Sequence, residues 1–188
     1  MEAFFVSTGL VAIAEIGDRT QLLALVLAAR YRRPLPIILG ILCATLANHA
    51  LAAWAGGLAA AWIGPEALRW ILGVSFLAMA AWCLVPDTAD DLPKRAAGAG
   101  AFVATLVAFF LVEIGDKTQI ATVALAARFD SIVLVTAGTT LGMMLANVPV
   151  VIFGGAIAKR LPLRAIRIVA ALIFVVLGVL VLAGVTIA

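Results

Sequence analysis

The sequence predicts an all-α integral membrane protein with six transmembrane helices, arranged as two inverted repeats of three helices each. Three observations support this prediction: the composition, six long apolar segments, and an acidic motif that occurs twice. Hydrophobic residues make up 65% of the 188 residues and charged residues only 12%. A soluble domain is roughly half apolar and one quarter charged, and a disordered chain has low hydrophobicity. The composition therefore excludes both classes and favours a protein dissolved in the lipid bilayer.

The net charge of +3 does not indicate nucleic-acid binding. The basic residues flank apolar segments, and they form no stripe or patch interleaved with aromatic side chains. The two cysteines, Cys43 and Cys83, lie far apart in apolar runs and lack the spacing of a zinc or redox site. We therefore expect the protein to contact the lipid bilayer and not nucleic acid. Both cysteines are expected to be packing residues.

Six apolar segments are each close to or above the roughly 20 residues that a helix needs to cross the hydrocarbon core. Their ranges are 3–29, 34–56, 67–85, 99–127, 132–157 and 165–186. The longest hydrophilic stretch, 86–97, is expected to be a cytoplasmic linker. It divides one membrane domain into a first three-helix repeat, 1–85, and a second, 98–188.

Lysine and arginine predict the orientation, since cytoplasmic loops carry an excess of these residues. The basic residues on the side of the loops after the first, third and fifth segments are Arg30, Arg32, Arg33, Lys94, Arg95, Lys159, Arg160, Arg164 and Arg167. The other side has only Arg69 and Arg128 near its segment ends. We expect those three loops to be cytoplasmic and both termini to face outward.

The most specific feature is an internal repeat of seven residues. The two copies are Glu15-Ile16-Gly17-Asp18-Arg19-Thr20-Gln21 and Glu113-Ile114-Gly115-Asp116-Lys117-Thr118-Gln119. Weaker echoes follow one segment later, with Asn48 matching Asn147 and Gly56 matching Gly155. Because three segments is an odd number, the second copy must enter the membrane from the opposite side. Inverted repeats that meet around a site at the bilayer midplane are common in secondary transporters.

The motif places acids and bases inside apolar segments, near the bilayer centre. Each such residue costs roughly 2.5–3.5 kcal/mol at the midplane, and this cost argues against a purely structural role. On a continuous helix, Glu15, Asp18 and Gln21 would share one face. Gly17 and Gly115 would either allow a partner helix to approach closely or allow the helix to unwind.

All the polar side chains around the motif offer oxygen, which suits Mg²⁺, Ca²⁺ or Mn²⁺. The predicted metal ligands are Glu15, Asp18, Glu113, Asp116, Gln21, Gln119, Thr20, Thr118, Asn48 and Asn147. Arg19 and Lys117 are predicted to compensate charge, so that four carboxylates and two bases leave two negative charges, enough for one divalent cation. Protons could replace the cation when it leaves, as in a cation/proton antiporter. The single histidine, His49, is more typical of a packing residue than of a ligand.

Two copies of E-x-G-D-[K/R]-T in a small six-span chain resemble the GDT family of divalent-cation transporters. The resemblance covers essentially the whole chain and implies export of Mn²⁺, and of Ca²⁺ in some members, in exchange for protons. It implies that Glu15, Asp18, Glu113 and Asp116 carry the cation, with less weight on the threonines and glutamines. The short linker is similar to that of bacterial members, which implies a prokaryotic plasma membrane, the inner membrane, as the location.

The sequence leaves other functions open. A small exporter of amino acids or other organic cations is the main alternative, although four carboxylates with almost no aromatic lining fit an inorganic ion better. An intramembrane aspartyl hydrolase would need a different residue before the Ile-Gly-Asp sequence, so we do not expect an enzyme. A passive channel could use the same residues. No cofactor is expected, with Mn²⁺ or Ca²⁺ as substrate, and the oligomeric state, including a homo-oligomer, stays open.

Overall fold

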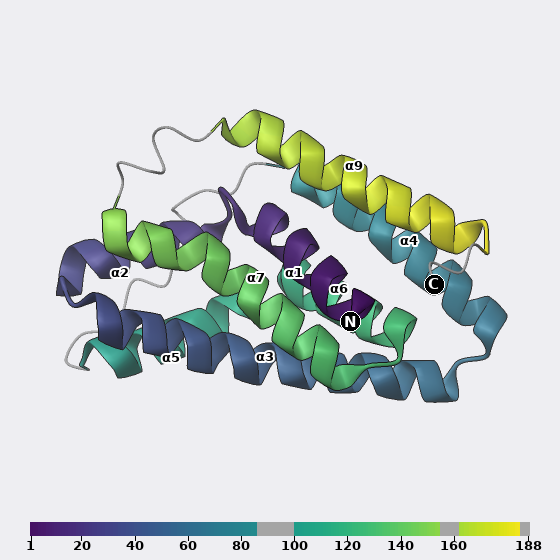
Figure 1. The fold of residues 1–188 in the computed structure, drawn as a ribbon, viewed down its shortest axis with the longest axis horizontal. Coiled ribbons are helices and arrows are strands. Elements are labelled where there is room, and N and C mark those ends of the chain that lie inside the picture. The colour runs from purple at the N-terminus through teal and green to yellow at the C-terminus, as the bar shows by residue number, and fades with distance from the viewer. Residues whose placement is uncertain (86–99, 155–161, 185–188) are drawn as a thin grey trace.

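The computed structural model describes residues 1–85, 100–154 and 162–184, and these ranges are entirely helical, with turns but no strands (Figure 1). The helices are α1 (Glu2–Glu15), α2 (Arg19–Tyr31), α3 (Pro34–Trp62), α4 (Pro65–Cys83), α5 (Ala101–Glu113), α6 (Lys117–Phe129), α7 (Ile132–Phe153) and α9 (Leu163–Leu182). The predicted linker at 86–97 and Gly155 lie outside the described residues. The all-α prediction is confirmed for the described part of the chain.

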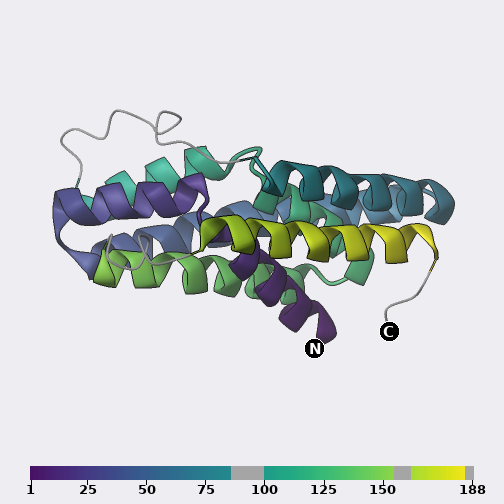
Figure 2. The same ribbon diagram turned by 90° about the horizontal axis from the view of Figure 1, so that it is seen from above.

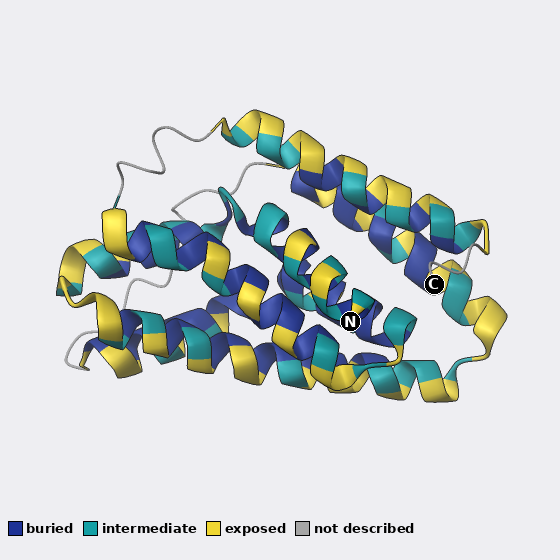
Figure 3. Ribbon diagram, viewed as in Figure 1, coloured by how far each residue is buried: buried dark blue, intermediate teal, exposed yellow. Residues whose placement is uncertain are grey.

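Four helices, α3, α4, α7 and α9, are long and apolar enough to cross a membrane. Their surfaces agree with a lipid environment, because large apolar side chains such as Leu172, Val176 and Trp62 are exposed. In Figure 3 the exposed residues lie on the outer faces of the helices and the buried residues on the faces between them. Four of the six apolar segments predicted from the sequence therefore form membrane-type helices.

The segments 3–29 and 99–127, each predicted as one membrane span, are not continuous helices. Each segment is split into two shorter helices by a break at the repeated motif. The break passes through Gly17 in the first half, with φ of 84°, and through Gly115 in the second, with φ of 75°. Glycine adopts these left-handed backbone angles without steric cost. Of the two roles considered for these glycines, the structure shows the unwinding of the helix.

The long helices bring the two breaks together. Helix α3, from the first half, packs along both α5 and α6 of the second half. Helix α7, from the second half, packs along α1 and, less extensively, α2 of the first half. Helices α3 and α7 also pack against each other, and α4 pairs with α9. Figure 2 shows α1 crossing at an angle to α9, which lies beside it. Each half therefore supports the broken helix pair of the other half.

Glycines allow the close approach of these helices. Gly56 lies inside α3 and is buried. A Cβ added at Gly56 would lie 2.2 Å from the backbone oxygen of Val123 in α6. Gly154, by contrast, does end α7, with φ of 66°. The glycine in α3 is thus a packing residue, and the one after α7 is a helix terminator.

We expect Gly56→Ala to destabilise the protein by about 1–3 kcal/mol, because the added methyl group must push α3 away from α6. The measurement is the melting temperature of purified protein in detergent. Gly9→Ala in α1 is the matched control, since a Cβ there meets no atom within 4 Å. Alanine is the better helix former, so this control should be neutral or stabilising by up to about 1 kcal/mol. An unchanged melting temperature for Gly56→Ala would contradict the packing role.

Candidate metal centre at the two helix breaks

The four acids of the repeated motif lie at equivalent places on the two broken helices. Glu15 is the last residue of α1, and Glu113 is the last residue of α5. Asp18 and Asp116 are the N-terminal caps of α2 and α6. All four are at most 2% exposed. The break, rather than a shared helix face, brings each glutamate close to its aspartate, so the prediction of one continuous face through Gln21 is wrong.

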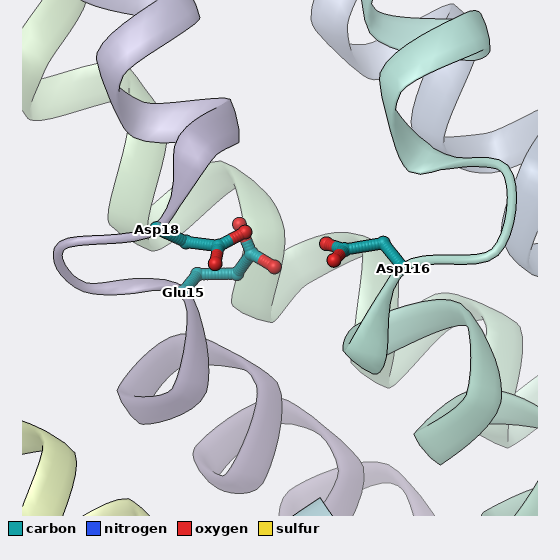
Figure 4. A group of neighbouring side chains, drawn as sticks. All are labelled: Glu15, Asp18 and Asp116. Atoms are coloured by element: carbon teal, nitrogen blue, oxygen red, sulfur yellow. The ribbon is translucent and has the colours of Figure 1, made fainter. Parts of the chain in front are cut away.

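Three of these carboxylates form a compact group. Oxygen atoms of Glu15, Asp18 and Asp116 all lie within 4.8 Å of one another. Figure 4 shows the three side chains pointing toward a common centre, with Asp116 reaching in from the other half of the chain. Three converging carboxylate oxygens are a donor set for a hard divalent cation.

The two bases of the motif pair across the halves. Arg19 donates through Nη2 to Oδ1 of Asp116 at 2.9 Å, and Nζ of Lys117 donates to Oδ1 of Asp18. Each base therefore contacts the aspartate of the other motif rather than the aspartate next to it in sequence. Lys117 is buried, whereas the side chain of Arg19 is 24% exposed. These two ion pairs link the two breaks and offset the charge of both aspartates.

The two glutamates have neutral partners instead. Thr20 donates its hydroxyl to Oε2 of Glu15, while Oε1 of Glu15 is buried without a hydrogen-bond partner in the described part of the chain. Glu113 accepts from the hydroxyl of Thr45 at 2.7 Å and from the amide of Asn48 at 3.0 Å. Glu113 lies outside the three-carboxylate group. The bases of the motif thus form their ion pairs with the aspartates and not with the glutamates.

The two glutamines brace the breaks. The side-chain oxygen of Gln21 accepts from the backbone N–H of Gly17 at 2.9 Å, and that of Gln119 accepts from Gly115 at 2.7 Å. The amide nitrogen of Gln21 donates to the backbone oxygen of Ala146 on α7 at 3.0 Å. These bonds satisfy backbone groups that the interrupted helix leaves without an intrahelical partner.

The remaining predicted ligands have different surroundings in the two halves. Thr118 donates to Oδ2 of Asp116 at the long distance of 3.5 Å. Asn48 also donates to the backbone oxygen of Phe110 at 3.0 Å, and its own oxygen accepts from Gln119 at 3.4 Å. Asn147 bonds within α7, to the backbone oxygen and the sulfur of Met143. The two asparagines therefore differ in their hydrogen bonds: Asn48 contacts the second helix break, whereas the amide nitrogen of Asn147 donates within its own helix.

Sequence reasoning missed Thr45 as a partner of Glu113. Its signal was its position three residues before Asn48, which places both on one face of α3. The repeat hid this signal, because the matching position on α7, counted from Asn147, is Met144. His49 is fully buried, and neither ring nitrogen has a hydrogen-bond partner in the described ranges. It lies outside the carboxylate group.

Comparison with known proteins decides the family. The family model described as divalent cation/proton antiporter GDT1 matches residues 3–91 and 101–187. The chain belongs to the GDT1 family. Members of this family are transporters, and the expectation of a divalent cation/proton antiporter is confirmed at the level of the family.

The relatives of this GDT1 chain extend over nearly its whole length. A Vibrio cholerae protein named "Putative manganese exporter" is 53% identical over 179 residues, covering 95% of this chain and 89% of the relative. A GDT1-like protein of Synechocystis is 28% identical over 203 residues, covering 95% and 96%. GDT1-like protein 4 of Oryza sativa is 25% identical over 199 residues, covering 92% and 70%. No solved structure matches the chain significantly.

Proposed function

We propose that this GDT1 chain exports a divalent cation, with Mn²⁺ as the main substrate and Ca²⁺ as a second one, in exchange for protons. The observation that carries this proposal is the buried group of Glu15, Asp18 and Asp116 between two helix breaks. The name of the Vibrio cholerae relative supports manganese and export. Oxygen ligands of this kind suit both metals, and cavity size and rigidity decide between them.

The pairing of charges supports the exchange mechanism. Each aspartate has a basic partner from the other half, so both ion pairs are close to neutral. Glu15 and Glu113 then carry two negative charges, which one divalent cation or two protons would neutralise. Buried charge in a membrane is costly, so the site alternates between these two neutral states. Export follows when the metal is released outside and protons enter on the same carboxyl groups.

We further propose that each broken pair, α1–α2 and α5–α6, acts as one membrane span. With α3, α4, α7 and α9 this gives six spans in two inverted halves, and the site lies near the midplane. The packing of α3 and α7 on the broken pair of the opposite half supports this arrangement. The loops after spans one, three and five would then face the cytoplasm of a prokaryotic plasma membrane, and a reporter at Ala188 would be active only outside.

Mn²⁺ flux in proteoliposomes tests the exchange. With Mn²⁺ inside, acidifying the outside should speed efflux, because the entering protons replace the leaving metal. Glu66→Gln is a suitable control variant, since Glu66 is exposed in the first turn of α4, away from the carboxylate group. Flux that ignores the pH gradient would contradict the exchange. Transport of lysine or arginine by protein that moves no metal would favour the organic-cation exporter instead.

The charge count also predicts electroneutral transport. One divalent cation against two protons moves no net charge, so a membrane potential set by potassium and valinomycin should leave the Mn²⁺ flux unchanged at zero pH gradient. The measurement is initial Mn²⁺ efflux at several potentials. A flux that rises steadily with the potential would show that net charge crosses the membrane, which would contradict the two-proton count.

A further inference from the structure

One asparagine of the repeated pair has an unused oxygen. The amide nitrogen of Asn147 donates to the backbone oxygen of Met143 at 3.1 Å and to its sulfur at 3.0 Å. Both bonds fix the orientation of the amide, and the side-chain oxygen of Asn147 is left buried without a hydrogen-bond partner in the described part of the chain. Buried polar atoms in proteins nearly always have a partner, so this oxygen needs an explanation.

Packing places this part of α7 beside the first helix break. A Cβ added at Gly142 would lie 2.6 Å from the backbone oxygen of Thr8, so Gly142 touches α1 before the break. The backbone oxygen of Ala146 accepts from Gln21, which lies in α2 after the break. Met143 and Asn147 are therefore at the level where α1 ends at Glu15, whose Oε1 is another buried acceptor without a hydrogen-bond partner in the described residues.

We propose that Met143 and Asn147 form the α7 side of the cation site, and that the Met143 thioether selects transition-metal dications over Ca²⁺ and Mg²⁺. This inference rests on the proposed function and narrows its substrate class. Asn147 supplies its carbonyl oxygen, and Met143 supplies a sulfur atom that is fully buried. Both acceptors without partners, on Glu15 and Asn147, would be satisfied by the same ion.

The selectivity follows from ligand chemistry. Ca²⁺ and Mg²⁺ bind oxygen almost exclusively, whereas thioether sulfur favours softer metal ions. A site of carboxylates and one amide alone has little means of separating Mn²⁺ from Ca²⁺. Adding a sulfur ligand strengthens binding of Mn²⁺, and of softer ions still more, without helping Ca²⁺. The bond from Asn147 to the backbone oxygen of Met143 keeps the amide in place when the sulfur turns to the metal.

The second helix break lacks this sulfur. Counted from the two asparagines, the position on α3 that corresponds to Met143 is Ala44. Thr45 and Asn48 donate to Glu113 there, through oxygen and nitrogen atoms. The amide nitrogen of Asn48 donates to Glu113, and its side-chain oxygen accepts from Gln119, so this oxygen has a partner. The two helix breaks are thus specialised, with selectivity residing at the first break.

The test is equilibrium binding and flux of Mn²⁺, Cd²⁺ and Ca²⁺ by wild type and Met143→Leu. Leucine keeps the volume and removes the sulfur. We expect Mn²⁺ binding to weaken on the order of tenfold, as for other groups that tune a metal site. Cd²⁺, the softest of the three ions, should lose more, and Ca²⁺ should change by less than about twofold. Met144→Leu is the matched control, because Met144 is half-buried and packs against apolar residues.

A second variant, Met143→Gln, replaces the sulfur by hard donors of similar reach. We expect it to weaken Cd²⁺ and Mn²⁺ binding and to leave Ca²⁺ binding unchanged or tighter. Equal loss for all three ions, or no loss for any, would overturn the role of the thioether. Absence of any divalent-cation flux in the wild type would instead overturn the proposed function, so the two failures can be told apart.

Discussion

Replacing Lys117 by glutamine is expected to destabilise the protein by about 3–5 kcal/mol, because it leaves the buried charge of Asp18 without its basic partner. Breaking a buried ion pair costs far more than the pair itself contributes, since the remaining charge stays in a medium that solvates it poorly. The measurement is the melting temperature in detergent, together with the fraction of protein that elutes as a single species.

The companion substitution Asp18→Asn should restore much of this stability in the Lys117→Gln background, because no isolated charge remains. Arg19→Gln is the milder comparison, since the side chain of Arg19 is 24% exposed and solvent weakens its attraction to Asp116. Lys117→Gln protein as stable as wild type would show that the pair across the halves is not a structural link.

Glu15→Gln is expected to lower divalent-cation flux about 100-fold. The substitution leaves one negative charge where the site needs two, so a bound divalent cation keeps a net positive charge inside the membrane. On the insertion scale one such charge costs roughly 2.5–3.5 kcal/mol, and each 1.4 kcal/mol is a factor of ten in affinity. The measurement is saturable Mn²⁺ uptake in proteoliposomes with protein of verified folding.

Glu113→Gln should reduce the flux to a similar extent, because it removes the other charge that no base of the motif offsets. Glutamine can keep the bond from Thr45 but loses the bond from Asn48, because its second terminal atom is a donor and not an acceptor. Glu66→Gln should transport like wild type. Wild-type flux in Glu15→Gln would mean that the cation is held elsewhere.

The repeated motif let the sequence predict most of the residues at the site, but not their pairing. Acids and bases inside apolar segments are costly, so their presence alone marked Glu15, Asp18 and their counterparts as candidates. The helix break was less visible, because the apolar pattern continues through Ile16 and Gly17. Only the positive φ of Gly17 shows that the helix ends there. Thr45 escaped prediction because its counterpart in the second half is a methionine.

The sequence by itself determined that the chain is apolar enough for a membrane, how many apolar segments it has, and which acids and bases its repeated motif carries, because composition and a repeated motif are properties of the chain alone. Only the tertiary structure decided which base meets which acid. Arg19 and Lys117 each follow an aspartate in sequence, yet adjacent residues on a helix do not face each other. The packing of α3 and α7 against the opposite broken helices turns each base toward the distant aspartate. Charge could be counted from the sequence, but its distribution between neutral pairs and two remaining glutamates required the fold.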